Sequence, residues 1–146
     1  LSLSHKHPEL SLDNSFIEEA AMLHDIGIFL TDAPRIHCNG NASYLCHGYL
    51  GAELLRAEGY PLQARVCERH TGTGLTKEQI IANGWDLPHC AFTPETLEEK
   101  LICFADKFFS KTHLDVEKPV EKAYKSISRF GEEGIIRFNE WCERFL

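Results

Sequence analysis

The strongest constraint on the fold is a helical period of apolar residues that runs along most of the chain. Gly and Pro fall mainly between the periodic segments, and no segment alternates convincingly between apolar and polar residues as a half-buried strand would. The sequence therefore predicts an all-α fold. Because 146 residues of 43% hydrophobic composition suffice for one packed core, we expect a single domain over residues 1–146.

Capping and stop signals divide this period into separate helices. Asp13 and Asn14 can cap a helix that begins near Ser15 and runs to Gly27, followed by a polar loop over residues 31–42. The run before Pro8 resembles the last turns of a helix, so we expect further residues upstream of Leu1. Further helices are predicted over residues 43–57, 61–70 and 95–111, with one or two more over 116–146 interrupted around Gly131 and Gly134.

Composition argues against several classes of function. A net charge of −7 and the lack of any Lys/Arg-rich run make nucleic acid an unexpected partner. The apolar runs are too short to cross a bilayer and no signal-peptide pattern is present, so we expect a soluble cytoplasmic protein without membrane contacts. The six cysteines contain no CxxC pair, which predicts free and mostly buried thiols.

Two adjacent residues of metal-ligand type, His24 and Asp25, lie in the helix predicted over residues 15–27. At 100° per residue, His24 shares an arc with Ile17 and Ala20, so its imidazole should point into the core. A carboxylate at the edge of a buried face is costly unless it is paired or binds a cation, and both side chains can reach one ion in an interhelical cleft. For the pair alone, a hydrogen-bonded helix end is the simpler interpretation.

A second carboxylate, Asp106, is predicted to be buried. On the helix expected over residues 95–111, Lys100, Lys107 and Lys111 form a solvated stripe, and Asp106 lies about a third of a turn away. The alternative to a ligand role is an ion pair with an arginine of another helix. The candidate arginines are Arg35, Arg56, Arg65 and Arg69.

Two further histidines, His47 and His70, occupy apolar helix faces. Each alone would be explained as a hydrogen-bonded core histidine. Together with His24, Asp25 and Asp106 they supply three imidazoles and two carboxylates from four helices. This donor set suits Fe, Mn, Zn, Co or Ni better than Mg or Ca, which prefer oxygen ligands.

The order of these residues resembles that of the HD superfamily of metal-dependent phosphohydrolases. Ala20–Gly27 is similar to the HDIG motif, and Phe104–Lys107 to the closing aspartate helix. Cys46–Ala52 and Glu68–Gly72 resemble the intervening histidine motifs of HD enzymes with two metals. The resemblance covers about residues 1–112. It implies an HD-domain helical bundle with the metal site between the central helices and a C-terminal helical extension over residues 113–146.

The resemblance also implies a mechanism and a ligand set. Metal-bound water would attack a phosphoester or phosphoanhydride of a nucleotide or a similar small phosphorylated molecule. Two divalent transition-metal ions are expected, with Asp25 as the catalytic bridge between them. His24, Asp106 and a histidine upstream of Leu1 would complete the first site, and His47 and His70 the second.

Further site residues are predicted around this centre. His37, in the polar loop, is a candidate proton donor to the leaving group. Ile28 stands where many HDIG proteins have lysine, so another cation would have to bind the substrate phosphate. The candidates are Arg35, Arg69, Lys77 and Lys107.

Two other functions remain compatible with this pattern. A few HD proteins use the same ligands as di-iron oxygenases, and a non-catalytic sensor of metal or nucleotide would also retain them. The sequence leaves a homodimer open. It does not identify the substrate or the metal.

Overall fold

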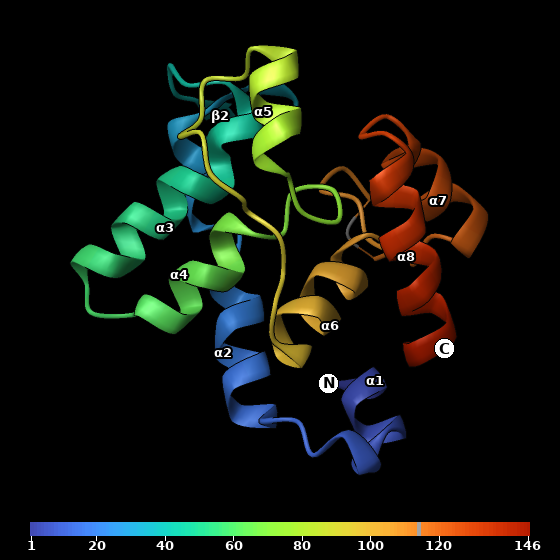
Figure 1. The fold of residues 1–146 in the computed structure, drawn as a ribbon. Helices are drawn as coiled ribbons and strands as arrows, with labels where there is room; N and C mark the ends of the chain where they lie inside the picture. The colour runs from blue at the N-terminus through green and yellow to red at the C-terminus, as the bar shows by residue number, and fades with distance from the viewer. Residues whose placement is uncertain (114) are drawn as a thin grey trace.

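The computed structural model describes residues 1–113 and 115–146, and its regular secondary structure is almost wholly helical (Figure 1). In the described chain, β1 (Asp32–Ala33) and β2 (Cys38–Asn39) pair antiparallel in the polar loop as two-residue strands. The predicted all-α fold is confirmed. The helices are α1 (Ser2–Lys6), α2 (Asn14–Leu23), α3 (His47–Ala57), α4 (Pro61–Glu68), α5 (Lys77–Asn83), α6 (Leu97–Asp106), α7 (Val120–Ser128) and α8 (Glu132–Phe145).

The helix predicted to run to Gly27 ends at Leu23, which corrects the sequence analysis. The Asp13 side chain accepts a hydrogen bond from the Phe16 N–H, as expected for its cap, and a 3₁₀ helix follows α2 over Ile26–Leu30. Gly27 explains the early end. A Cβ at Gly27 would lie 2.3 Å from the His47 carbonyl oxygen and 2.4 Å from the Gly51 nitrogen, so this segment crosses the α3 backbone where only glycine fits.

Two more predicted helices also end early. α4 ends at Glu68 instead of His70, and α6 ends at Asp106 instead of Lys111. α3 begins at His47, after a 3₁₀ turn over Tyr44–Cys46. The candidate ligands therefore lie at or just beyond helix ends, where side chains can turn toward one point without projecting from the middle of a packed helix.

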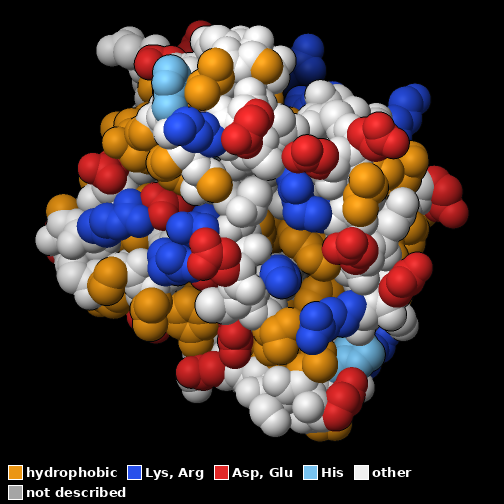
Figure 2. Space-filling model, in the orientation of Figure 1, with side chains coloured by type: hydrophobic (Ala, Val, Ile, Leu, Met, Phe, Trp, Pro, Cys, Tyr) orange, Lys and Arg blue, Asp and Glu red, His pale blue; other side chains and the backbone are white. Residues whose placement is uncertain are grey.

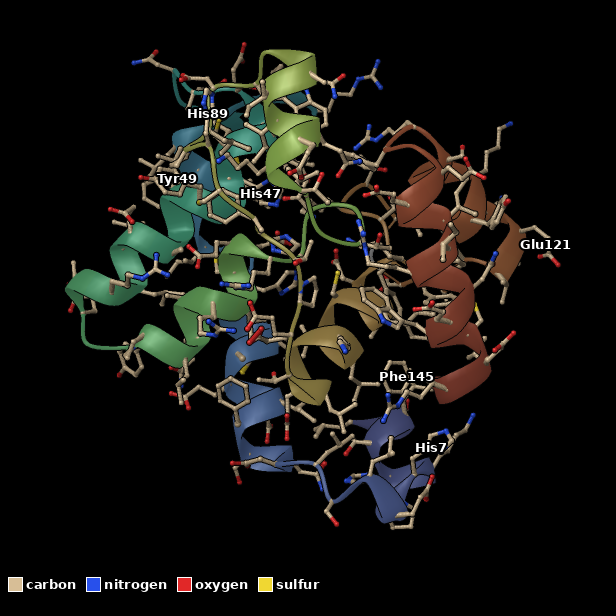
Figure 3. All side chains as sticks on the ribbon, viewed as in Figure 1. His7, His47, Tyr49, His89, Glu121 and Phe145 are labelled. Atoms are coloured by element: carbon tan, nitrogen blue, oxygen red, sulfur yellow. The ribbon has the colours of Figure 1, made fainter. Side chains whose placement is uncertain are left out.

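The main hydrophobic core joins α2 and α6 to the two C-terminal helices. The Phe104 ring lies 5.0, 5.5 and 5.6 Å from the rings of Phe108, Phe138 and Phe145, measured between centroids. Near the chain ends, His7 Nε2 lies 3.0 Å from the Phe145 carbonyl oxygen (Figure 3). The C-terminal helices thus share one core with the helix that carries Asp106.

Smaller features of the fold agree with the composition. Figure 2 shows basic and acidic side chains interspersed over one face of the molecule. All six cysteines are free as expected, although only Cys46, Cys67 and Cys103 are buried. Among the described residues, every helix is too short or too polar to cross a membrane.

Candidate metal centre

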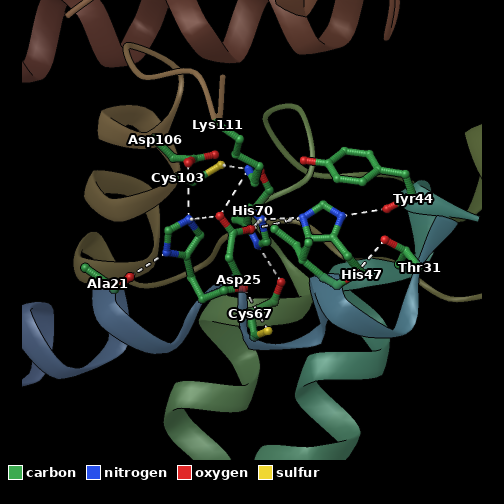
Figure 4. Close-up of polar contacts among 12 residues, drawn as sticks. Ala21, Asp25, Thr31, Tyr44, His47, Cys67, His70, Cys103, Asp106 and Lys111 are labelled. Atoms are coloured by element: carbon green, nitrogen blue, oxygen red, sulfur yellow. Dashed lines mark hydrogen bonds and ion pairs between the residues drawn. The ribbon is translucent and has the colours of Figure 1, made fainter. Parts of the chain in front are cut away.

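The five predicted ligands meet between the ends of α2, α4 and α6 and the start of α3 (Figure 4). They are His24, Asp25, His47, His70 and Asp106. His24 Nε2 lies 3.1 Å from Asp106 Oδ1 and 3.1 Å from Asp25 Oδ2. On the other side, Asp25 Oδ1 lies 3.3 Å from His47 Nε2 and 3.2 Å from His70 Nε2. Asp25 therefore lies between two groups of donors, one containing His24 and the other containing His47.

A backbone carbonyl three residues earlier fixes the orientation of each imidazole. His47 Nδ1 lies 2.6 Å from the Tyr44 oxygen and His70 Nδ1 lies 2.6 Å from the Cys67 oxygen. His24 Nδ1 makes the same contact with the Ala21 oxygen. Because a carbonyl only accepts, each Nδ1 carries the hydrogen and donates it. In its neutral form each ring presents an unprotonated Nε2 to the cluster, and this form binds metal.

In the half of the cluster that Asp25, His47 and His70 form, none of the facing atoms carries a hydrogen. His47 Nε2 and His70 Nε2 are 2.9 Å apart, and both face Asp25 Oδ1. Among the described residues, that buried oxygen has no hydrogen-bond partner. Lone pairs at this distance repel one another, and a buried unpaired carboxylate oxygen is costly. A cation between these atoms removes both penalties, so the residues present fit a divalent transition metal.

The pKa shifts differ between the two sides of the cluster. Burial works against a charge on His24, but Asp106 and Asp25 raise its pKa to about 10, so a metal ion would have to displace the proton on its Nε2. Burial lowers the pKa of His70 to about 4, so its ring is neutral at physiological pH. Burial opposes the charge of Asp25, but the contact with His24 keeps its pKa well below the usual range. The group around His70 thus combines a carboxylate anion with a neutral imidazole.

Comparison with known families matches residues 2–110 to the HD domain. The chain belongs to the HD domain family. This family consists generally of metal-dependent hydrolases, and its members bind divalent metals.

Several relatives resemble this HD domain. An uncharacterized protein of Methanocaldococcus jannaschii is 33% identical over 131 residues, which cover 88% of this chain and 70% of the relative. The tRNA (cytidine(56)-2'-O)-methyltransferases of Picrophilus torridus and Thermoplasma volcanium are each 32% identical, over 78% and 92% of this chain. The matched segments cover only 30% and 36% of those two enzymes. A search of solved structures gave no significant match.

Two lysines, Lys107 and Lys111, face the cluster and do not form the predicted solvated stripe. Lys107 Nζ donates to the His70 carbonyl oxygen at 2.7 Å and to Asp106 Oδ2 at 2.8 Å. Lys111 Nζ lies 3.0 Å from Asp25 Oδ2. The helical wheel placed both incorrectly because α6 ends at Asp106 and the chain then leaves the helical path.

The alternative explanation of Asp106, an ion pair with an arginine, is wrong. Its partners are Lys107 and His24. Arg56 pairs with Glu68, and Arg65 pairs with Glu99. The role of Lys111 beside Asp25 was missed, and its only sequence signal is its position a few residues after a ligand-bearing helix.

A cavity of about 270 Å³ opens beside the cluster. His47, His70 and Asp106 lie on one side of it, with Lys107 and Lys111 along its wall. The predicted substrate residue Lys107 therefore lies where it can reach a bound anion.

The structure does not bring the other predicted site residues to this cavity. Arg35 and His37 are exposed in the 31–42 loop, and Lys77 is exposed at the start of α5. Arg69 donates to the Thr93 carbonyl oxygen at 2.7 Å and pairs with Glu95. Of the first histidines, His5 is exposed and His7 contacts Phe145, so neither joins the cluster.

Proposed function

We propose that this HD domain is a metal-dependent phosphohydrolase that cleaves a phosphoester or phosphoanhydride of a nucleotide or a similar small molecule. The observation that carries the proposal is the pair of Nε2 atoms, of His47 and His70, aimed at the unpartnered Asp25 Oδ1. A structural polar cluster would place a hydrogen between such atoms, whereas a metal centre would not. Membership of the HD family supports the same reaction class.

The side chains divide into two sets of ligands. His24, His70 and Asp106 offer one set of close donor atoms, and Asp25, His47 and His70 offer the other. With Asp25 between His24 and His47, two ions can share this centre. When bound, the metal lowers the pKa of a water molecule and polarises a phosphoryl oxygen.

Lys111 is suited to stabilise charge on the substrate. Burial disfavours its ammonium form, but Asp106 and Asp25 raise its pKa, so the group keeps its proton throughout the physiological range. A permanently charged donor at the cavity wall stabilises negative charge on a phosphoryl group. Lys111 is therefore an electrostatic residue and a poor proton donor to the leaving group.

Metal analysis joined to a substrate panel tests this function. We expect the purified protein to contain Fe, Mn, Zn, Co or Ni by mass spectrometry. We also expect it to hydrolyse at least one of p-nitrophenyl phosphate, bis-p-nitrophenyl phosphate and a set of nucleotides. Chelation should abolish turnover, and added Mn²⁺ or Co²⁺ should restore it.

Two matched variants make the test specific. Asp25→Asn should lose metal and activity, whereas Asp32→Asn, which changes an exposed carboxylate on β1, should keep both. Full activity of Asp25→Asn would contradict the proposal. Iron-specific oxygen consumption without hydrolysis would favour the oxygenase instead, and nucleotide binding without any turnover would favour the sensor.

A further inference from the structure

The C-terminal helices, outside the family match, are fixed to the loop that follows His70. Arg137 donates from Nε to the Thr73 carbonyl oxygen and from Nη2 to the Gly74 oxygen, both at 3.1 Å. Thr73 Oγ1 donates to the Gly134 carbonyl oxygen at 3.0 Å. Figure 1 shows α7 and α8 side by side next to α6. This segment is thus held against the metal centre.

The turn between α7 and α8 is held just as closely. Gln79 Nε2 donates to the Phe130 carbonyl oxygen at 2.5 Å. The Phe130 ring packs on Gly72, where an added Cβ would lie 2.9 Å from the ring, and Gly72 also has a φ of 58°. Two independent contacts therefore fix the position of Phe130. They also fix the backbone of Arg129, which precedes it in the chain.

Residues of this segment form part of the wall of the cavity beside the ligands. Lys118, Ser126, Arg129 and Phe130 line the same cavity as His70. The Lys118 backbone N–H donates to the Phe108 carbonyl oxygen at 2.6 Å, which ties this lysine to the end of the α6 segment. The C-terminal extension thus places two cations, Lys118 and Arg129, at the substrate cavity.

These two cations differ from the two lysines nearer the metal ligands. Lys107 and Lys111 are paired with Asp106 and Asp25. Over residues 1–113 and 115–146, neither Lys118 nor Arg129 forms an ion pair. Burial lowers the pKa of Lys118, and the neighbouring charges of Lys107 and Lys111 lower it further, although Asp106 opposes this. The part of the cavity that Lys118 and Arg129 line therefore has unbalanced positive charge, which an anionic group of a ligand would neutralise.

We propose that Lys118 and Arg129 form a second phosphate subsite, so that the cavity prefers nucleotides with two or more phosphates over monophosphates. This inference rests on the proposed function, in which one phosphoryl group lies at the metal centre. A further phosphate then extends along the wall toward the C-terminal helices. The guanidinium of Arg129 lies 4.6 Å from the centre of the Phe130 ring, which leaves its N–H groups free to bind phosphate oxygens.

Binding measurements test the subsite without requiring turnover. The probes are fluorescently labelled AMP and a labelled imido analogue of ATP, followed by anisotropy on the protein as purified. In the double variant Lys118→Gln and Arg129→Gln, we expect affinity for the triphosphate analogue to fall about tenfold or more, because two charge-assisted contacts are lost. Affinity for AMP should change by less than about threefold, because its single phosphate stays at the metal centre.

A control variant with the same charge change is available in α7 and α8 of the same C-terminal segment. Lys125→Gln with Arg144→Gln alters exposed side chains away from the cavity and should leave both affinities unchanged. Equal loss of both nucleotides in the first variant, or no loss of either, would overturn the second subsite. A protein that hydrolyses nothing but shows the selective loss would refute the phosphohydrolase proposal and retain the subsite.

Discussion

Two sets of carboxylates in this molecule, one buried and one half-buried, have opposite surroundings. Glu68 and Glu99 are 9% and 3% exposed, and an arginine faces each of them. Arg56 donates to both oxygens of Glu68, at 2.8 and 2.6 Å, and Arg65 donates to both oxygens of Glu99, at 3.1 and 3.2 Å. Asp25 instead has one oxygen that faces only imidazole nitrogens.

The difference separates structural ion pairs from the proposed metal ligands. A guanidinium brings a permanent charge and two parallel N–H groups, which satisfy a carboxylate fully. An imidazole whose Nδ1–H is already used offers only a lone pair. Asp106 combines both situations, because its Oδ2 accepts from Lys107 while its Oδ1 faces His24. One oxygen is held in place and the other is left for an ion.

Metal removal should produce the largest loss of stability. The loss should depend on the set of aspartates, Asp25 and Asp106, and not on the glutamate–arginine pairs. At free metal of about a thousand times Kd, binding adds about 4 kcal/mol to the free energy of unfolding. Chelation should remove this contribution, as measured by urea unfolding with and without metal. Asp106→Asn should lose most of the metal-dependent difference. Identical wild-type unfolding curves under the two conditions would contradict a metal site here.

Breaking a glutamate–arginine pair should cost stability without affecting metal. Glu99→Gln removes a buried charge that faces Arg65 and accepts from the Glu95 backbone N–H. We expect a loss of about 2–3 kcal/mol, below the range for fully buried pairs because Arg65 is partly exposed. Urea unfolding measures this loss, and mass spectrometry should find an unchanged metal content.

An exposed glutamate of α8, Glu143, provides the control for this change. Glu143→Gln should change the free energy of unfolding by less than about 0.5 kcal/mol. A Glu99→Gln protein that loses its metal while remaining folded would show that the two sets of carboxylates are not independent.

Much of the metal centre could be predicted from the sequence because its residues lie in local patterns. Helical spacing placed His24 on an apolar arc, and the ordered motifs identified His47, His70 and Asp106 without any tertiary information. The structure brings these side chains together. Each motif is short enough for the helix geometry to decide where its key residue points.

The remaining features depend on contacts between distant segments. α2 ends at Leu23 because the chain at Gly27 passes very close to the α3 backbone. The helical period of apolar residues does not predict that contact. The positions of Lys107 and Lys111 depend on where α6 stops. The arginine partners of Glu68 and Glu99 lie 12 and 34 residues away in the chain, so no local pattern identifies them.

The smallest effect should come from changing the geometry of an arginine pair while keeping its charge. Arg56→Lys replaces two N–H donors to Glu68 by a single ammonium group. Arg56 is 40% exposed, so water compensates part of the loss, and we expect a cost of about 1 kcal/mol by urea unfolding. Arg56→Ala should cost more, because it leaves Glu68 buried without a cation. If Arg56→Lys were as stable as the wild type, bidentate pairing would not explain why Glu68 tolerates burial, and the contrast with Asp25 would rest on charge alone.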